Sequence, residues 1–446
     1  MTFNKFLIIF PVVNKNLGFK IAFFLLFIFI LGSWIFSLTS PDEGKNAFPV
    51  FFMLKTHNFL VPYYNCHPRL EKPPMLYWIA CLLSYIFGLN EFSLRLVSGL
   101  SAIGIAVFTY LIAKEFIDES TAIKSMLILA TLPHFWIEAR AFTPEMLLNF
   151  FSVGGIYFFI VNRPCLGWIF FAFAVLTKGP VGVILPIAVV VFFKLFKKEI
   201  KIFDLKGLVL FFLVASSWYV YMLYKFGYEY FYEFFLVQNI YRFTGKVKIH
   251  YYPWYYYLVV IALTSFFYLP AYLKLLNSIR KSKFPELKTK LKDPFVMWFL
   301  FVLVFYSTSK GKLHHYIIFS YPALAVILAR HCGRTCLKFG ILFSSCLLLI
   351  GLAYIHSVEK HRFINLSKKW LNRNEPIYFY KTELSAATFY AKKCIPELKK
   401  LTPQVKGLII TKPKYEKLFK GCQVLVNAKE FSKKYSLLLC NINSLN

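Results

Sequence analysis

The sequence contains few acidic residues, and charged residues as a whole are scarce. Only 21 of its 446 residues are aspartate or glutamate, and charged residues make up 16% of the chain. Soluble domains are about 45–50% apolar with about a quarter of their residues charged, whereas this chain is 58% hydrophobic. These proportions exclude a soluble globular protein and predict an all-α polytopic membrane protein.

Motifs that define several other protein classes are missing. The nine cysteines show no CxxC or other metal-ligand spacing, and no glycine-rich nucleotide loop, internal repeat or low-complexity tract is present. Cys394, Cys422 and Cys440 fall in the C-terminal tail, where one disulfide could form, but the sequence supports no particular pairing. The sequence therefore gives no motif that indicates a CxxC metal centre or a nucleotide-binding loop.

Basic residues greatly outnumber acidic ones. Lysine and arginine total 52, which gives a formal net charge of +31. These residues lie in loops between apolar segments and in the tail, as expected for loops held at the cytoplasmic membrane surface, so we infer contact with membrane lipids and no nucleic-acid partner. A second group of cations is expected to bind an anionic substrate.

Apolar runs along the chain predict about eleven transmembrane helices. A helix rises about 1.5 Å per residue, so crossing a hydrocarbon core of about 30 Å takes about 20 apolar residues. The first span is interpreted as uncleaved, with a cytoplasmic N-terminus, because Lys5, Lys15 and Lys20 precede it and no small-residue cleavage site follows it. The predicted spans are 21–39, 92–113, 121–138, 146–161, 165–177, 180–194, 207–224, 254–273, 295–308, 316–330 and 339–356.

The segment 75–89 decides which loops share a side of the membrane. It is too short to span easily, and Tyr77 and Trp78 are residue types found at the headgroup level. We predict that it lies along the interface as an amphipathic helix. If it crossed the membrane instead, Glu71 and Arg140 would lie on opposite faces.

With this topology the C-terminal tail lies outside the membrane on the periplasmic side. We predict a transmembrane domain over 1–356 and a small soluble α/β domain over 357–446. The tail alternates short apolar runs with helix-like stretches. The predicted strands are 377–380, 407–410, 424–426 and 436–439, and the predicted helices are 385–391 and 413–419.

Polar side chains that are costly to bury in lipid gather on the predicted outer face. Cations with a few carboxylates suit an anionic ligand held by lysine and arginine, with an acid that positions or deprotonates a second substrate. The residues are Asp42, Glu43, Arg69, Glu71, Lys72, Arg140, Glu145, Lys178, Glu233, Asn239, Arg242, His250, Lys310, Lys312, His314, His315 and Tyr316.

Three of the outer motifs place charges beside prolines that restrict the backbone. They are the segments 71–74 (Glu-Lys-Pro-Pro), 140–145 (Arg-Ala-Phe-Thr-Pro-Glu) and 178–180 (Lys-Gly-Pro). The alternative for Lys178 is an interfacial lysine whose ammonium group extends to the headgroups. The alternative for the pair at 42–43 is a solvated helix end.

The order of these motifs resembles a known family. They are Asp42-Glu43, Glu71-Lys72-Pro73-Pro74 with Tyr77-Trp78, Gly88-Leu-Asn-Glu-Phe-Ser-Leu-Arg95, Arg140-Ala-Phe-Thr-Pro-Glu145, Lys178-Gly179-Pro180 and Ser309-Lys-Gly-Lys312 followed by Tyr316. The set is similar to the GT-C polyprenyl-phosphate-sugar glycosyltransferases, especially the bacterial lipid A aminoarabinose transferases, which are related to the protein O-mannosyltransferases. The resemblance covers about residues 20–330.

The resemblance implies a role for each motif. Asp42, Glu43 and Glu71 would be catalytic, with Asp42 as the base, and Glu145 would position the acceptor or the sugar. Glu71 and His250 would match positions that can hold a divalent metal such as zinc. The lipid phosphate of the donor would lie among Lys72, Arg140, Lys178, Arg242, Lys312 and Tyr316.

Two features depart from the family pattern. Glu145 stands where the family more often has aspartate, and the tail is short for the closest relatives. Both departures weaken the assignment of the substrate, but they do not weaken the assignment of the reaction class.

The chemistry of sugar transfer agrees with these residue types. Displacing a polyprenyl phosphate from an anomeric carbon develops negative charge on the phosphate, which fixed cations stabilise while a carboxylate accepts the proton of the attacking hydroxyl. The resemblance implies an inverting transferase at the outer face of a bacterial inner membrane. It would move a sugar, with 4-amino-4-deoxy-L-arabinose as one candidate, from undecaprenyl phosphate to lipid A or another envelope acceptor.

Two alternatives remain for the function. The first is a protein O-glycosyltransferase of the same fold. The second is a flippase or transporter for an anionic lipid, which would also need outer cations. Transporters commonly contain inverted repeats with broken helices that meet at the midplane, and neither feature is visible in the sequence.

Overall fold

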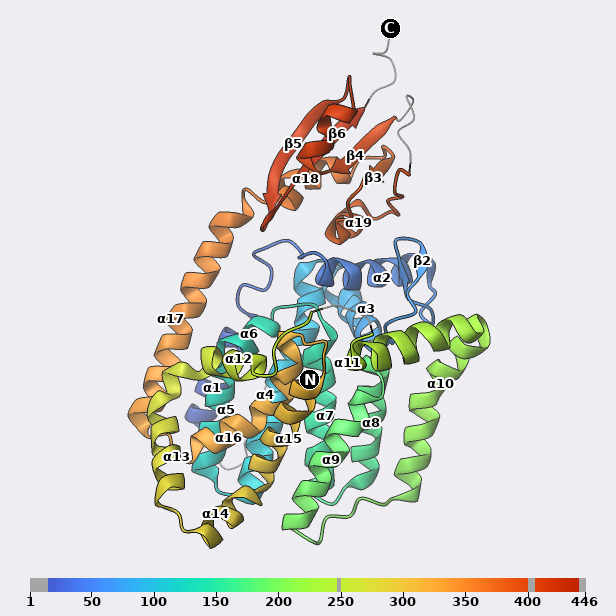
Figure 1. The fold of residues 1–446 in the computed structure, drawn as a ribbon. Helices are drawn as coiled ribbons and strands as arrows, with labels where there is room; N and C mark the ends of the chain where they lie inside the picture. The colour runs from blue at the N-terminus through green and yellow to red at the C-terminus, as the bar shows by residue number, and fades with distance from the viewer. Residues whose placement is uncertain (1–14, 247–249, 400–405, 441–446) are drawn as a thin grey trace. The chain divides into compact units, whose positions relative to one another are not determined.

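The computed structural model describes residues 15–246, 250–399 and 406–440, which are mostly helical with a small sheet near the C-terminus (Figure 1). Lys5, used above to orient the first span, lies outside these residues. The chain divides into two compact units. The first comprises Met1–Leu31, Leu70–Leu76 and Arg95–Leu348, and the second comprises Gly32–Arg69, Tyr77–Leu94 and Leu349–Asn446. The predicted domain boundary at residue 356 stays a prediction.

The first unit is built from helices. It contains the larger part of α4 (Glu91–Phe116) and the first part of α17 (Arg334–Glu359). Its other helices are α1 (Lys15–Ile30), α5 (Glu119–Thr131), α6 (Pro133–Glu138), α7 (Pro144–Ile160), α8 (Pro164–Lys178), α9 (Val181–Phe196), α10 (Leu205–Tyr230), the π-helix η2 (Phe231–Tyr241), α11 (Arg242–Thr244), α12 (Tyr256–Ser265), η3 (Phe266–Tyr268), α13 (Leu269–Lys281), α14 (Phe284–Leu291), α15 (Pro294–Thr308), η4 (His314–Ser320) and α16 (Tyr321–Ala329).

The second unit combines helices with the four-stranded sheet of the tail. Besides most of α3 (Met75–Phe87), its elements are α2 (Asp42–Thr56), β1 (Tyr63–Tyr64), β2 (His67–Pro68), α18 (Phe363–Leu371), β3 (Ile377–Phe379), α19 (Ser385–Ala391), β4 (Gly407–Thr411), η5 (Pro413–Leu418), β5 (Gln423–Glu430) and β6 (Lys433–Cys440). The sheet has the order β3-β4-β6-β5, with β3 and β4 parallel and the other pairs antiparallel. The four predicted strands and the helix at 385–391 are thereby confirmed.

The described residues include four helices that are long and apolar enough to cross a membrane. They are α4, the continuous stretches Leu205–Thr244 and Tyr256–Lys281, and α17, and a fifth results if α14 and α15, bent by 70°, form one span. Each predicted span overlies helical structure, but the count of eleven is not confirmed. One reason is that the range 121–138 breaks at Leu132, whose extended backbone precedes Pro133.

The long helices differ in how much of their apolar surface the protein covers. The apolar window of α4 is 72% buried, whereas that of Leu205–Thr244 is 33% buried and that of α17 is 22% buried. Leu213 and Val220 of α10 are exposed, as is Leu273 of α13. Exposed apolar faces of this kind suit contact with lipid chains.

The start of the chain differs from the predicted pattern in two places. The first helix ends at Ile30 rather than near residue 39, and Asp42 begins a separate helix, α2, that the sequence analysis did not predict. Helix α3 has 13 residues, about 20 Å of helix, which is too short to cross the bilayer. This length agrees with the predicted interfacial helix, whose orientation stays a prediction.

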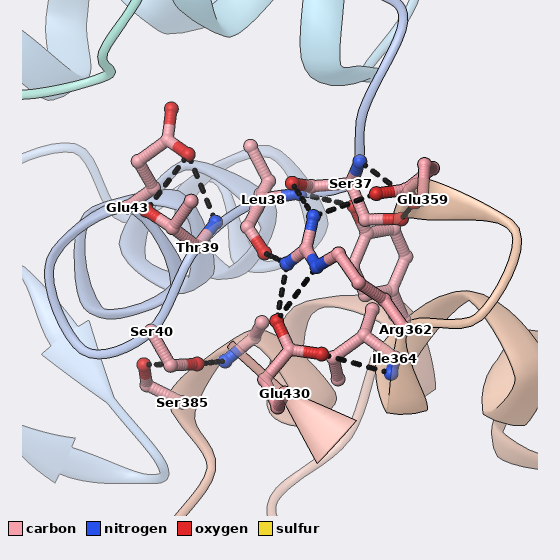
Figure 2. A network of polar contacts seen from close by, with 12 residues as sticks. Ser37, Leu38, Thr39, Ser40, Glu43, Glu359, Arg362, Ile364, Ser385 and Glu430 are labelled. Atoms are coloured by element: carbon pink, nitrogen blue, oxygen red, sulfur yellow. Dashed lines mark hydrogen bonds and ion pairs between the residues drawn. The ribbon is translucent and has the colours of Figure 1, made fainter. Parts of the chain in front are cut away.

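A buried ionic network stabilises the second unit (Figure 2). The Arg362 guanidinium group lies between the carboxylates of Glu359 and Glu430 and also donates hydrogen bonds to the backbone oxygens of Ser37 and Leu38. All three ionic side chains are less than 10% exposed. The network therefore joins the segment before α2 to the end of α17 and to β5.

Two disulfides also lie within the second unit. Cys66 pairs with Cys394, and Cys422 pairs with Cys440. The bridge between Cys422 and Cys440 joins two of the three tail cysteines. The other bridge joins the third, Cys394, to Cys66 in the β1–β2 turn, a pairing that was not predicted from the sequence.

Candidate active site

Helices α7, α8 and α9 form the frame of the candidate site in the first unit, where they run side by side (Figure 1). A proline opens α7, so Glu145 lies in its first turn. Helix α8 ends at Lys178, and Gly179 then adopts a φ of 96°, which side chains with a Cβ rarely adopt. The first turn of α7 and the last turn of α8 therefore meet at one end of the bundle.

Glu145 is the centre of a buried ionic cluster. Its Oε1 atom lies 2.6 Å from Lys178 Nζ and 3.1 Å from His315 Nε2. The Lys178 ammonium group also lies 4.4 Å from the centroid of the Tyr316 ring. The side chains of Glu145, Lys178 and His315 are 6%, 17% and 12% exposed. A carboxylate with these partners fixes the lysine at the edge of the site instead of leaving it mobile in solvent.

Two further cations lie near this cluster. Arg242 interacts electrostatically with Lys178, and Lys72 interacts with Glu145. Arg242 directly follows the π-helix η2. This helix packs closely against the turn after α8, as a Cβ atom added to Gly179 would lie only 2.9 Å from Phe234 Cζ. Within the described residues, Lys178, Arg242 and Lys72 thus gather around Glu145, and a group of cations of this kind suits an anionic ligand.

A pocket opens beside Glu145 and Lys178. Its polar end carries these two residues with His315 and Tyr316, and its remaining wall is largely apolar. The lining residues are Glu145, Leu148, Asn149, Ser152, Lys178, Val181, Leu185, Pro186, Tyr306, His315, Tyr316 and Phe319. The charged side chains and the apolar wall therefore lie next to each other in this small pocket.

A second polar cluster lies in the same unit. His134, Glu138 and His314 place their ligand atoms within 4.8 Å of one another. His134 and Glu138 are four residues apart on α6, so they share one face of the helix, and His314 begins η4. His134 and Glu138 were not predicted from the sequence, although a histidine and a glutamate four residues apart at the end of an apolar run were a usable signal.

Arg140 has a structural environment rather than a place in the cationic cluster. Its five N–H groups have backbone oxygens as acceptors, namely those of Phe27, Ile28 and Leu31 at the end of α1 and that of Trp136. These contacts satisfy carbonyls that lack partners at a helix C-terminus. We therefore leave Arg140 out of the proposed phosphate site, contrary to the role that the resemblance implied.

Lys312 and His250 lie in loops that pair with each other. The backbone N–H of Lys312 donates to the His250 oxygen at 3.0 Å, and Lys312 Nζ donates to the Ser309 oxygen. Burial lowers the pKa of Lys312. His250 is exposed with a φ of 57°. Neither residue belongs to the Glu145 cluster or to the histidine cluster on α6, and a metal held by Glu71 and His250 stays a prediction.

The predicted acidic residues fall in both units. Asp42 is exposed at the start of α2, whereas Glu43 is buried and accepts hydrogen bonds from the N–H and hydroxyl of Thr39. Both belong to the second unit, and Glu71 lies half-buried in a turn of the first. The two carboxylates of the pair therefore differ, since that of Asp42 is exposed and that of Glu43 is bonded to Thr39 in the segment before α2.

Comparison with known proteins gives matches over different lengths. A family model described as dolichyl-phosphate-mannose-protein mannosyltransferase matches residues 71–221. An uncharacterized protein of Aquifex aeolicus (strain VF5) is 46% identical over 413 residues, which cover 92% of this chain and 96% of that protein.

Proteins of lower sequence identity to this chain have names that state an activity or a ligand. An undecaprenyl phosphate-alpha-4-amino-4-deoxy-L-arabinose arabinosyl transferase of Shewanella sediminis (strain HAW-EB3) is 28% identical over 71% of this chain, which spans 59% of that protein. The crystal structure of ArnT from Cupriavidus metallidurans bound to undecaprenyl phosphate has a TM-score of 0.75 at 17% identity, covering 96% of this chain and 98% of that one. The likeness to this structure shows that the fold is shared.

Proposed function

This chain belongs to the GT-C glycosyltransferase family, and we propose that it transfers a sugar from undecaprenyl phosphate to lipid A or another envelope acceptor. The proposed sugar is 4-amino-4-deoxy-L-arabinose, which is supported by the names of the relatives matched over about three-fifths of their length. The protein is a multi-pass membrane protein.

The observation that carries the proposal is the cationic cluster at the polar end of the pocket. Lys178, held by Glu145, together with Arg242 and Lys72 would bind the donor phosphate, with the Tyr316 hydroxyl as a further donor. As the sugar leaves, charge accumulates on this phosphate, and cations that are already in position stabilise it without reorganisation.

Asp42 is the proposed general base for an acceptor hydroxyl. It is exposed, whereas the neighbouring Glu43 is committed to Thr39. Attack by the activated hydroxyl on the anomeric carbon, on the face opposite the phosphate, would invert the configuration at that carbon. An acceptor phosphate that is already ionised would need Asp42 for positioning more than for proton transfer.

The disulfides support an active site on the periplasmic face of a bacterial inner membrane. Disulfides persist in oxidising compartments and are rare in the cytosol. The bridge between Cys66 and Cys394 requires that the β1–β2 turn and the tail face the same compartment. We therefore propose that the tail and the segment that carries Asp42 both lie on the periplasmic side.

A transfer assay with the purified full chain tests the proposal. Radiolabelled undecaprenyl-phosphate aminoarabinose is incubated with lipid A, with an envelope protein fraction or with no acceptor, and the labelled products are separated. Label on lipid A supports the proposal, label on protein supports the O-glycosyltransferase alternative, and donor moved across a vesicle without transfer supports a flippase. Absence of transfer from every polyprenyl-phosphate sugar tried would overturn the assignment.

A further inference from the structure

We propose that His134, Glu138 and His314 bind a zinc ion. The three ligand atoms are His134 Nε2, Glu138 Oε1 and His314 Nδ1. Their separations are 3.0 Å between the histidine nitrogens, 3.3 Å from His314 to Glu138 and 3.8 Å from His134 to Glu138. Zinc bonds to nitrogen and oxygen of about 2.0–2.1 Å place neighbouring ligands of a tetrahedron about 3.3 Å apart. The cluster therefore has the dimensions of one face of a zinc site.

The surroundings of His134 fix the direction of its ligand atom. Its Nδ1 atom forms a hydrogen bond of 2.7 Å with the hydroxyl of Tyr321, and its backbone N–H donates to Thr264 Oγ1 at 3.0 Å. When Nδ1 carries the proton of this bond, the lone pair of Nε2 points toward Glu138 and His314. A hydrogen bond on the second ring nitrogen is the usual support of a metal-binding histidine.

The burial of Glu138 also favours a cation in the cluster. The Glu138 side chain is 5% exposed, and within the described ranges its ion-pair contacts are the two histidines. A buried carboxylate beside neutral imidazoles is poorly compensated, whereas a divalent ion supplies the missing positive charge. Two nitrogen ligands and one oxygen ligand suit zinc and leave a fourth position for water. The His314 side chain is 53% exposed, so one ligand of the cluster lies at the surface.

The proposed ion would also hold the loop that leads into the pocket. His314 is followed directly by His315, which contacts Glu145, and by Tyr316, which lies under Lys178. A bond from zinc to His314 would fix the first residue of η4 against α6. This positioning effect on turnover rests on the proposed function, whereas zinc binding itself does not.

Metal analysis of the full chain in detergent tests the site without an activity assay. The protein is stripped with a chelator, dialysed and titrated with zinc chloride, with bound zinc measured by mass spectrometry and affinity by calorimetry. We expect at least one zinc per chain, with one ion at this cluster, and, with cobalt in its place, the visible absorption of a tetrahedral ion. Failure of the stripped, folded protein to take up one zinc per chain would overturn the proposal.

Variants assign the bound ion to the cluster. His314→Ala removes an exposed ligand and should leave the fold intact, and Glu138→Gln retains the shape of the side chain. Each should weaken zinc binding at least about tenfold, since even indirect supports of a metal contribute 10–100-fold. His331→Ala, at a half-buried histidine outside the cluster, is the matched control. Zinc binding that survives His314→Ala but is lost in His250→Ala would place the ion elsewhere and contradict the proposal.

Discussion

Lys178 Nζ lies 2.6 Å from Glu145 Oε1, although the two residues are 33 positions apart in the chain and on different helices. Each charge compensates the burial of the other, and removing one partner of a buried pair typically costs about 3–5 kcal/mol. A loss of activity in a Lys178 variant could therefore come from lost phosphate binding or from a destabilised bundle. Measuring stability and activity together in a single and a double variant separates these two causes.

We expect Lys178→Met to lower kcat/KM at least tenfold, because a charge-assisted contact to phosphate contributes about 1.5–3 kcal/mol. The double variant Lys178→Met with Glu145→Gln removes both buried charges and should recover most of the lost thermal stability without recovering activity. Thermal melting and steady-state kinetics on both proteins measure the two effects. Lys206→Ala, at an exposed lysine at the start of α10, is the control. Recovery of activity in the double variant would show that Lys178 is structural only.

Asp42→Asn should reduce turnover about 10²–10⁴-fold with a hydroxyl acceptor while donor affinity stays unchanged, because the amide retains the shape but not the basicity of the carboxylate. Glu43→Gln should mainly lower thermal stability, since Glu43 accepts hydrogen bonds from Thr39. Donor binding and single-turnover rates distinguish the two variants. An Asp42→Asn enzyme with the normal rate on every acceptor would rule out a catalytic role.

Arg140→Ala should destabilise the protein by roughly 3 kcal/mol or more, because it leaves the backbone oxygens at the end of α1 without their buried donors. The KM for the donor should remain unchanged in the protein that stays folded. Lys72→Ala provides the contrast, because it removes a cation of the proposed phosphate site and should therefore raise the donor KM. A raised donor KM in an Arg140→Lys enzyme of normal stability would return Arg140 to the phosphate site.

Alkylation of the denatured protein should label five cysteines before reduction and nine after it, because four cysteines form the two disulfides. Mass spectrometry of the intact protein counts the labels. Cys66→Ser and Cys394→Ser should each destabilise the second unit by about 2–5 kcal/mol, and the double variant should be no worse than either single one. Nine labels without reduction, in protein taken directly from the membrane, would contradict both bridges.

Labelling with a membrane-impermeant maleimide tests the topology at exposed positions. Asp42→Cys and Lys310→Cys should react from the periplasmic side, and Lys198→Cys should react only after the membrane is permeabilised. Arg140 is a poor labelling site because it is 5% exposed. Reaction of Asp42→Cys and Lys310→Cys from opposite sides would refute the prediction that these two residues face the same compartment.

Arg362→Met should destabilise the second unit by about 3–5 kcal/mol, because it leaves Glu359 and Glu430 buried without their cation (Figure 2). Hydrogen exchange of the β5 and β6 amides measures this loss within the unit. Arg373→Met, at an exposed arginine after α18, is the control. Unchanged exchange in both variants would show that the network contributes little to stability.

Much of this protein could be read from local sequence. The high apolar content predicted a membrane protein, and the short apolar runs of the tail predicted all four strands, because both depend on residue types within a short window. The ordered motifs also indicated the GT-C family, which the comparisons confirmed. The number of spans was less accessible, since apolar runs divided by prolines form short helices whose length alone does not decide whether they cross.

The sequence by itself determined the class of protein, the family and the residues of the two charged ends of α7 and α8. Only the tertiary structure decided which partners these residues have. It paired Lys178 with Glu145 and His315, directed Arg140 to the end of α1, and joined His134 and Glu138 to His314. These contacts join residues that lie far apart in the chain. Which residues meet depends on how the helices pack, and no short window of sequence specifies this packing.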